Sequence, residues 1–252
     1  MNGETILRIA GLKKSFGANH VLRGVDVAFQ EGKVSAVIGQ SGTGKSVLIK
    51  SIVGVLVPDR GSISYRDEEL LSASKERQRV IRRRFGYLFQ DSALFDSLTV
   101  AENIAFPLVE GGRVKDRELI RTTVAETLDW IGLPGIEQKL PSELSGGMRK
   151  RVGLARTLAT KPEVVLFDEP TTGLDPVLAE SINDLILRVN KEFKTTCILI
   201  THDIQATFRI SDFIGFLNEG QVQVQGTPKE VSESTNPLLQ KFIANSFQRM
   251  EV

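Results

Sequence analysis

One stretch of this 252-residue chain indicates its fold most directly, namely Gly39-Gln40-Ser41-Gly42-Thr43-Gly44-Lys45-Ser46. It matches the pattern G-x-x-x-x-G-K-[ST] at every fixed position, and an apolar run at 34–38 precedes it. A buried strand is expected over that run, and a helix is expected from Lys45 to about Val55. Glycines let successive backbone N–H groups face an anion, and the helix adds the positive end of its dipole. The stretch therefore predicts a phosphate-binding loop between a strand and a helix.

Two side chains of this loop carry the chemistry that a nucleotide site needs. Lys45 can reach the β- and γ-phosphate oxygens as a point charge. The Ser46 hydroxyl can coordinate Mg²⁺. We assign nucleotide binding to all eight residues of the loop and to Val47, which follows it.

A second motif places two carboxylates at the end of a buried strand. The run Val164-Val165-Leu166-Phe167 leads directly into Asp168 and Glu169. Ligands of open α/β sheets bind at the carboxyl ends of the strands, so Asp168 is placed to hold Mg²⁺. Glu169 is placed to polarise an attacking water. Together with the loop, this motif indicates a P-loop nucleoside triphosphatase that uses ATP and Mg²⁺.

Charge and composition limit the partners that such a protein can have. Lys and Arg number 32 and Asp and Glu number 31, so the net charge is +1. This balance argues against a protein held mainly by nucleic acid phosphates, and no nucleic acid partner is predicted. The sequence has no apolar run of the ~20 residues that a bilayer-spanning helix requires, no signal peptide at its beginning and one cysteine, Cys197. These features predict a soluble protein of a reducing compartment that acts at a membrane only through a partner.

The order of apolar runs predicts a mostly parallel α/β sheet preceded by antiparallel strands. Val25, Val27 and Phe29 alternate with polar residues, as does the segment 62–65, which is typical of half-exposed antiparallel strands. Trp130, among apolar neighbours, is expected in the core. The remaining expected elements are a charged, helix-rich segment at 75–84, helices at 116–131 and 145–159, strands at 164–168 and 196–201, a hairpin at 213–217 and 221–225, and helices beginning at Thr227 and Asn236.

The stretch Leu144-Ser145-Gly146-Gly147-Met148 resembles the LSGGQ signature of the ABC-type ATPases. By its residues alone, Ser145 is a helix N-cap followed by two glycines, so the stretch is a second anion-binding helix N-terminus on one chain. The resemblance implies that Ser145, Gly146 and Gly147 contact ATP. Met148 stands where the family usually has Gln, and a thioether cannot donate an amide's hydrogen bonds.

Four further positions are similar to motifs of the same family. Gln90 matches the Q-loop glutamine, His202 the switch histidine, Asp175 the D-loop acid and Phe16 the aromatic residue that stacks on adenine. The resemblance implies that Gln90 touches Mg²⁺ and water, that His202 contacts the γ-phosphate, and that Asp175 links two nucleotide sites. The similarity extends from about residue 6 to residue 227.

The family resemblance implies an α/β fold with three parts in one ABC ATPase domain, 1–252. A nucleotide-binding core of mostly parallel sheet, with an N-terminal antiparallel β subdomain, is expected at about 1–90 and 160–226. A helical subdomain that carries the signature is expected at about 91–159, and C-terminal helices at 227–252.

The resemblance also implies a mechanism in which two copies form a head-to-tail dimer around ATP. The loop 39–46 of one copy binds the nucleotide, and Ser145 and Gly147 of the other copy cover it. Glu169 is the general base, assisted by His202, Gln90 and Lys45. The implied Mg²⁺ ligands are Ser46, Gln90 and Asp168.

Within the family, the loop after Gln90 is similar to the ATPase of Mla/MCE-type phospholipid transporters. The carrying patterns are F-Q-x-x-A-L-F, V-x-x-N-x-x-x-P-L and S-E-L-S-G-G-M. This resemblance implies ATP-driven phospholipid transport between inner and outer membranes, at the cytoplasmic face of the inner membrane. The implied partners are a permease docking near Gln90–Pro107, an MCE-domain periplasmic protein and a small STAS-type regulator.

Three alternatives remain open at this point. The ATPase of a small-solute importer, such as one for polar amino acids, shares every catalytic motif. A non-transport ABC protein acting on DNA or ribosomes usually carries two cassettes or a long coiled coil, and neither is present. The run Arg82-Arg83-Arg84 is expected to be a solvated helix end rather than a nucleic acid contact. An inactive binding module is disfavoured by the intact Lys45, Asp168, Glu169 and His202.

Overall fold

The computed structural model describes residues 4–110 and 114–248 and contains two sheets. A six-stranded sheet has the order β10-β9-β3-β8-β7-β6, and a four-stranded sheet has the order β2-β1-β4-β5. The strands are β1 (Thr5–Phe16), β2 (Asn19–Gln30), β3 (Val34–Ile38), β4 (Arg60–Tyr65), β5 (Glu68–Glu69), β6 (Phe85–Leu88), β7 (Val164–Asp168), β8 (Thr196–Thr201), β9 (Phe213–Asn218) and β10 (Gln221–Gly226). The helices are α1 (Lys45–Val53), α2 (Lys75–Arg82), α3 (Val100–Val109), α4 (Arg117–Trp130), α5 (Gly146–Leu158), α6 (Pro176–Phe193), α7 (Ile204–Ile210), α8 (Pro228–Ser232) and α9 (Pro237–Gln248).

The centre of the molecule is a parallel sheet buried on both faces. β3 pairs in parallel with β8 and β9, and β7 pairs in parallel with β6 and β8. Every residue of β3, β7 and β8 is buried, which explains their continuous apolar or small character. The strands predicted at 34–38, 164–168 and 196–201 are confirmed, as is the β9–β10 hairpin.

The N-terminal sheet is antiparallel, as the alternating pattern predicts. Val25, Val27 and Phe29 are buried on one face of β2, while β1 pairs antiparallel with β2 and β4. Helix α1 lies between the two sheets, and its Leu48 and Ile52 belong to the apolar cluster that both sheets share. The helix that follows the phosphate loop therefore packs against both sheets.

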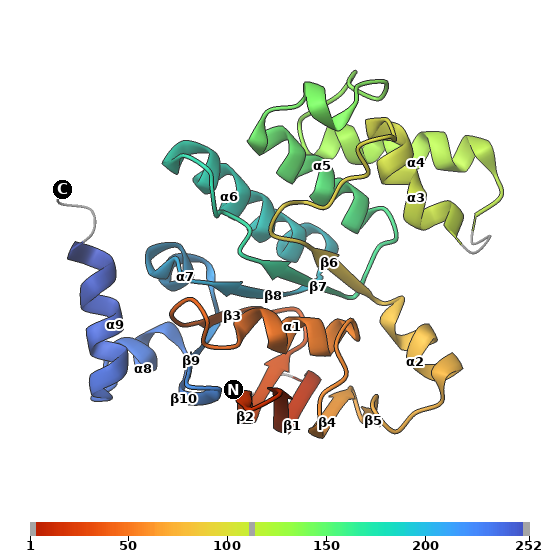
Figure 1. Cartoon of the computed structure of the whole chain (residues 1–252). Coiled ribbons are helices and arrows are strands. Elements are labelled where there is room, and N and C mark those ends of the chain that lie inside the picture. Colours follow the sequence, from red (N-terminus) through yellow and green to blue (C-terminus); the bar gives the residue numbers. More distant parts are fainter. Residues whose placement is uncertain (1–3, 111–113, 249–252) are drawn as a thin grey trace.

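Helices α3, α4 and α5 gather at the end of the molecule opposite the antiparallel sheet (Figure 1). They have an apolar cluster of their own, which includes Ile104, Leu128 and Val152. Trp130 packs against two apolar clusters, as predicted, but it is only half-buried. Its indole N–H donates to Glu192 at the surface, 2.6 Å away.

Several helix ends differ from the expected ones for local reasons. α1 ends at Val53, two residues before the expected end, because Gly54 adopts a left-handed conformation with φ 81°. α5 begins after Ser145, whose side chain accepts the N–H of Met148 as predicted for an N-cap. The capping box at Thr227 is also present. Six strands and helices have no counterpart among the segments predicted from the sequence, namely β1, β5, β6, α3, α6 and α7. Among the described residues, no helix has both the length and the apolar character needed to cross a membrane.

Candidate nucleotide-binding site

The loop between β3 and α1 has a backbone that larger residues would not allow. Gly44 has φ 105°, and a Cβ atom there would lie 2.8 Å from the Leu22 side chain. At Gly39 a Cβ atom would lie 2.3 Å from the carbonyl oxygen of Leu217. Gly44 is also the N-cap of α1 and offers no capping side chain, so the first N–H groups of this helix receive no side-chain acceptor. An anion is the ligand that such a helix end binds.

Lys45 is nearly buried, and its ammonium group is held at the base of the loop. Nζ donates to the carbonyl oxygens of Gly39 at 2.7 Å and Gln40 at 3.0 Å, and it lies 3.6 Å from Glu169 Oε1. Burial lowers the pKa of Lys45, while the charges of Glu169 and Asp168 oppose that shift. A bound phosphate would add negative charge beside this cation and favour its protonated form.

Ser46 and Asp168 bring two oxygen donors together although 122 residues separate them. The Ser46 hydroxyl donates to Asp168 Oδ1 at 3.3 Å, and Tyr87 donates to Asp168 Oδ2 at 2.8 Å. Asp168 is 5% exposed, so its orientation is fixed by these two contacts. Hydroxyl and carboxylate oxygens are ligands that Mg²⁺ prefers, and this ion usually takes few protein ligands beside water and phosphate. Consistently, no cluster of three His, Cys, Asp or Glu side chains able to hold a metal occurs in the described part of the chain.

Glu169 occupies a strained position directly after β7. Its φ is 48°, and its backbone N–H donates to the carbonyl oxygen of Ile200 in β8. Its Oε2 atom accepts a hydrogen bond from Thr172 at 3.2 Å and lies 2.8 Å from His202 Nδ1. The arrangement gives a carboxylate with fixed orientation at the edge where β7 and β8 end, in reach of a histidine.

These residues surround one open cavity of about 340 Å³. The residues around it come from β2, the loop, α1 and the segments after β6, β7 and β8; they are Val21, Ser41, Gly42, Gly44, Lys45, Ser46, Val47, Gln90, Glu169, Thr172 and His202. All of these residues except Val21 and Thr172 were predicted from the sequence. The parallel order of the strands explains the convergence, since their carboxyl ends meet at one edge of the sheet.

Nine of the predicted site residues do not line this cavity. Four of them belong to the loop or to the end of β7 beside it, namely Gly39, Gln40, Thr43 and Asp168. The other five lie elsewhere in the chain. Phe16 lies 49% exposed at the end of β1, and Lys14 is positioned over its ring. Ser145 and Gly146 are exposed at the start of α5, and Asp175 caps α6 by accepting the N–H groups of Val177 and Leu178 at 3.0 Å. Gly147 packs near Leu178. The nucleotide contacts assigned to these residues remain predictions.

A basic residue that the sequence analysis does not name supports the segment that carries Gln90. Lys150 of α5 is buried, and its ammonium group donates to the backbone carbonyl of Gln90. Burial lowers the pKa of Lys150, and Asp91, Asp168 and Glu169 oppose this shift. The start of the signature helix is therefore tied directly to the loop at the cavity. The one signal in the sequence for this contact is the position of Lys150 on the buried face of α5.

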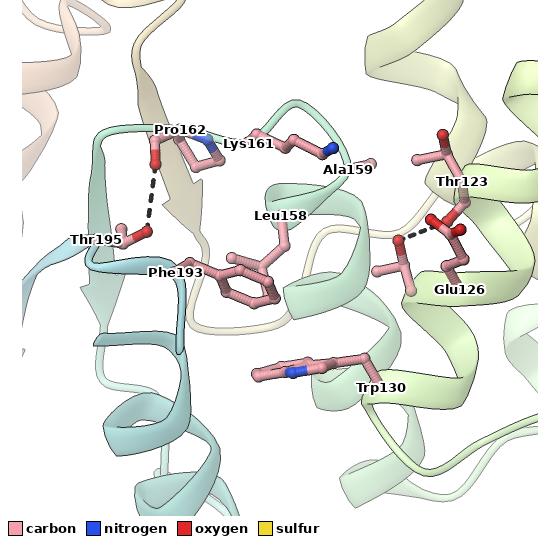
Figure 2. A pocket seen from close by; sticks show the side chains of 10 residues that line it. Thr123, Glu126, Trp130, Leu158, Ala159, Lys161, Pro162, Phe193 and Thr195 are labelled. Atoms are coloured by element: carbon pink, nitrogen blue, oxygen red, sulfur yellow. Dashed lines mark hydrogen bonds between the residues drawn. The ribbon is translucent and has the colours of Figure 1, made fainter. Parts of the chain in front are cut away.

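A second cavity, of about 370 Å³, lies among α4, α5, the segment before β7 and the end of α6. Figure 2 shows the rings of Trp130 and Phe193 and the Leu158 side chain close together on its apolar wall. The two ring centroids are 5.1 Å apart. None of the predicted catalytic or binding residues lines it, so size and apolar lining alone do not identify the nucleotide site here.

The comparison with known proteins agrees with this geometry. A family model described as "ABC transporter" matches residues 22–172, which is more than half of the chain. The chain therefore belongs to the ABC transporter family, and it is an ATP-binding cassette with ATPase activity. Its fold is the α/β P-loop fold of these ATPases, with a parallel core sheet and an antiparallel sheet.

Two solved structures show how far the fold is shared. The chain resembles "Dimeric structure of a post-hydrolysis state of the ATP-binding cassette MJ0796 bound to ADP and Pi" with a TM-score of 0.80 and 29% identity, over 88% of this chain and 98% of that one. It also resembles cbiO1 from Clostridium perfringens, part of the complex cbiONQ, with a TM-score of 0.83 and 30% identity, over 99% and 100% of the two chains.

Curated relatives come from several transport systems. The Probable ribonucleotide transport ATP-binding protein mkl of Mycobacterium leprae is 40% identical over 94% of this chain and 68% of its own length. The Intermembrane phospholipid transport system ATP-binding protein MlaF of Haemophilus influenzae is 33% identical over 95% and 90%. The Methionine import ATP-binding protein MetN of Caulobacter vibrioides is 41% identical over 85% and 64%. The chain spans 66% to 68% of the length of the mycobacterial relatives.

Proposed function

We propose that this chain is the ATPase subunit of a phospholipid transporter and that its cavity hydrolyses ATP in a dimer of two copies. The observation that carries the catalytic part is the convergence of Lys45, Glu169 and His202 on one cavity. In this proposal the loop 39–46 and Val47 bind the triphosphate, and Phe16 stacks on the adenine. Residues 39–46 offer the anion-binding backbone, and Lys45 adds a buried cation beside it.

Glu169 is the general base of the proposed reaction. His202 and Thr172 hold its carboxylate, which favours one orientation toward an attacking water. His202 is more than half exposed, so it can also reach a γ-phosphate. Ser46, Asp168 and Gln90 would hold Mg²⁺, which when bound neutralises charge on the phosphates.

The second half of each site is supplied by the partner copy. Ser145 and Gly146 are exposed and do not line the cavity, which supports a contact with the nucleotide of the other copy. The solved relative MJ0796 is dimeric, which supports a head-to-tail arrangement. Asp175, at the start of α6, would connect the two sites. The proposed subdivision assigns 1–90 and 160–226 to the core, 91–159 to the helical part and 227–252 to the C-terminal helices; the separate apolar cluster of α3, α4 and α5 supports it. Residues 1–3, 111–113 and 249–252 of these ranges lie outside the described part.

The permease is proposed to dock in a groove beside Gln90, at the cytoplasmic face of the inner membrane. Phe89 and Phe95 are 37% and 42% exposed, and the Phe95 and Phe106 rings lie 4.6 Å apart in this groove. Exposed apolar side chains grouped in a groove are typical of a docking surface. An MCE-domain protein and a STAS-type regulator complete the proposed complex.

Phospholipid is the proposed substrate because the loop after Gln90 has the Mla-type pattern and MlaF matches over 90% of its length. Protein TRIGALACTOSYLDIACYLGLYCEROL 3, chloroplastic, of Arabidopsis thaliana is also 38% identical over 97% of this chain. A solute importer is the second candidate, since MetN is 41% identical over 85% of this chain. That match covers only 64% of MetN.

Purification of the chain with its membrane partners tests the substrate. Mass spectrometry is expected to identify a permease and an MCE-domain protein, and the reconstituted complex is expected to move a fluorescent phospholipid between vesicles in an ATP-dependent way. A complex with a periplasmic solute-binding protein, whose ATPase responds to methionine rather than phospholipid, would support the importer instead.

The docking groove is tested by Phe95→Asp. The free subunit should keep its ATPase activity, while the permease should no longer co-purify, because a charge replaces an apolar contact. The matched control is Phe193→Asp, which alters a half-exposed ring of the second cavity. Retained permease with Phe95→Asp would count against docking in this groove.

A further inference from the structure

Helix α2 and the residue after it present a row of cations along one face. Lys75, Arg79, Arg82 and Arg83 follow a spacing of four, three and one residues, which places them on one side of the helix. None of these four side chains forms an ion pair within the described part of the chain. Like charges spaced by four residues destabilise a helix, and no ion pair among the described residues offsets this repulsion within the row.

Two other arginines of the same segment behave differently. Arg77 forms an ion pair with Glu68 of β5, and Arg84 forms one with Glu163 at 2.7 Å. The molecule therefore neutralises the cations that face the antiparallel sheet and β7. Figure 1 shows α2 at the side of the molecule, between β5 and β6, where its other face has no covering element.

Arg82 is the fixed member of the row. Its guanidinium lies across Gly54 so closely that a Cβ atom there would be 2.1 Å from Cζ. Its Nε atom is buried and has no hydrogen-bond partner. Burial also lowers the pKa of Arg82. A buried Nε–H group without an acceptor carries a cost, and its burial holds the guanidinium in place beside Gly54.

The cationic row lines a hollow of about 510 Å³ next to the aromatic groove. The residues around this hollow are Lys75, Gln78, Arg79, Arg82 and Arg83. Arg82 and Arg83 also line the groove of about 480 Å³ that contains Phe89, Phe95 and Phe106. The groove and the hollow therefore share two arginines, and we treat the two together as one depression with an aromatic half and a cationic half.

We infer that the segment docking in this depression is a protein segment with apolar side chains for the aromatic half and carboxylates for the Arg79, Arg82 and Arg83 half. This inference rests on the proposed docking of a permease and adds the chemistry of its contact. A single docked segment accounts for both halves, because they are neighbouring hollows that share Arg82 and Arg83. An anionic membrane surface, in contrast, is flat and would leave the aromatic half unexplained. Opposite charges across an interface also fix the register of docking.

A photo-crosslinking amino acid in place of Val80 tests the partner directly. Val80 is 43% exposed on α2, so the substitution does not disturb the core. In the assembled complex, the crosslinked peptide is expected to come from a cytoplasmic loop of the permease and to contain Asp or Glu within about one helical turn of the crosslinked residue. A crosslinked permease peptide without an acidic residue there would overturn the inference while leaving the proposed docking intact.

The charge itself is tested by Arg79→Gln with Arg83→Gln in one variant. Both side chains are exposed, so the subunit should fold and keep its own ATPase activity. Recovery of the permease should fall at least about tenfold at low salt, and it should depend less on salt than recovery by the wild type does, because the screened charges are gone. The matched control, Lys115→Gln with Arg117→Gln, removes two exposed cations elsewhere and should change nothing. The replacement Arg83→Glu should reduce recovery of the permease. A basic residue in place of the permease's acidic residue near the crosslink should restore that recovery.

Two outcomes separate the remaining explanations. If the wild-type chain recovers no permease at all, the proposed function fails, and with it the inference. If the chain floats with vesicles of phosphatidylcholine and 30% phosphatidylglycerol, and the glutamine variant does not, the row binds lipid headgroups and the inference is overturned. We expect equal, weak flotation of both proteins with anionic and neutral vesicles.

Discussion

Helices α1 and α5 both begin at glycine-rich segments, but the surroundings of their N-termini differ. At α1 the N-cap is Gly44, which has no side chain to offer, and Lys45 is buried beside the open N–H groups. At α5 the N-cap is Ser145, whose hydroxyl accepts the N–H of Met148 at 3.3 Å. Ser145 and Gly146 are both exposed there.

This difference separates a helix start that has a cation and a carboxylate of its own chain beside it from one that is capped by a serine hydroxyl and exposed. The start of α1 has a cation, an acid and a histidine around one cavity, whereas none of the residues around that cavity comes from the start of α5. Dipole and backbone donors alone contribute little at an exposed helix end. In the proposed dimer, α5 acts only when a second copy brings it to the phosphates held by α1. Four sets of substitutions test this difference between the starts of α1 and α5.

The largest effect is expected from Glu169→Gln, because the start of α1 can bind a nucleotide without this base but cannot activate water. Hydrolysis should fall roughly 10²–10⁴-fold while ATP binding persists. ADP release and a fluorescent-nucleotide titration measure the two properties separately. The control is Glu126→Gln, which changes a carboxylate of the second cavity and should have no effect on either. Unchanged turnover in the Glu169 variant would remove it from the catalytic role.

Mixing two inactive variants tests whether the two helix starts work across a dimer. Lys45→Ala disables the α1 half, and Gly146→Asp disables the α5 half by placing negative charge near the phosphate. The Gly146 change is tolerated within the chain, since a Cβ atom there meets only Leu174 at an ordinary 3.9 Å.

Each variant alone should be inactive, and an equal mixture should recover up to about a quarter of the wild-type rate, because about half of randomly paired dimers carry one intact site. A mixture that stays inactive, with dimers shown by light scattering, contradicts the composite site.

Tyr87→Phe probes a support that only the α1 half has. It removes the hydroxyl that donates to Asp168 Oδ2 at 2.8 Å. The Mg²⁺ concentration for half-maximal ATPase activity should rise roughly 3–10-fold, with little change at saturating Mg²⁺, because one oriented hydrogen bond is worth about 1 kcal/mol. Tyr65→Phe is the control, since its hydroxyl bonds to Glu163 far from the cavity residues. Identical Mg²⁺ curves for Tyr87→Phe and the wild type would rule out this positioning role.

The smallest effect is expected from Ser145→Ala, which removes the cap of α5. The free energy of unfolding should fall by about 1 kcal/mol. Gly44→Ala at the start of α1 should cost more, about 2–4 kcal/mol, because it combines φ 105° with a close contact to Leu22. Urea denaturation measures both. Equal losses would mean that the two helix starts are under similar constraint.

Prediction from sequence succeeds for elements whose signal is local. The run at 34–38 is apolar throughout because β3 is buried on both faces, and Ser145 is recognisable as a cap from its place before a helix. α6 was not predicted, although Ile182, Ile186 and Val189 recur at helical spacing and are buried. Its start also has a readable signal, since Asp175 caps it and Pro176 occupies its first position.

The phosphate loop, the acidic end of β7 and the family could be predicted from the sequence alone, because each depends on a short pattern that has a direct chemical reason. Which residues far apart in the sequence come into contact follows from the tertiary structure alone. Tyr87 reaches Asp168 because β6 and β7 are neighbours in the sheet, and Glu169 meets His202 because β7 and β8 end at the same edge. Pairing order and backbone conformation, such as φ 48° at Glu169, depend on long-range packing that no local pattern records.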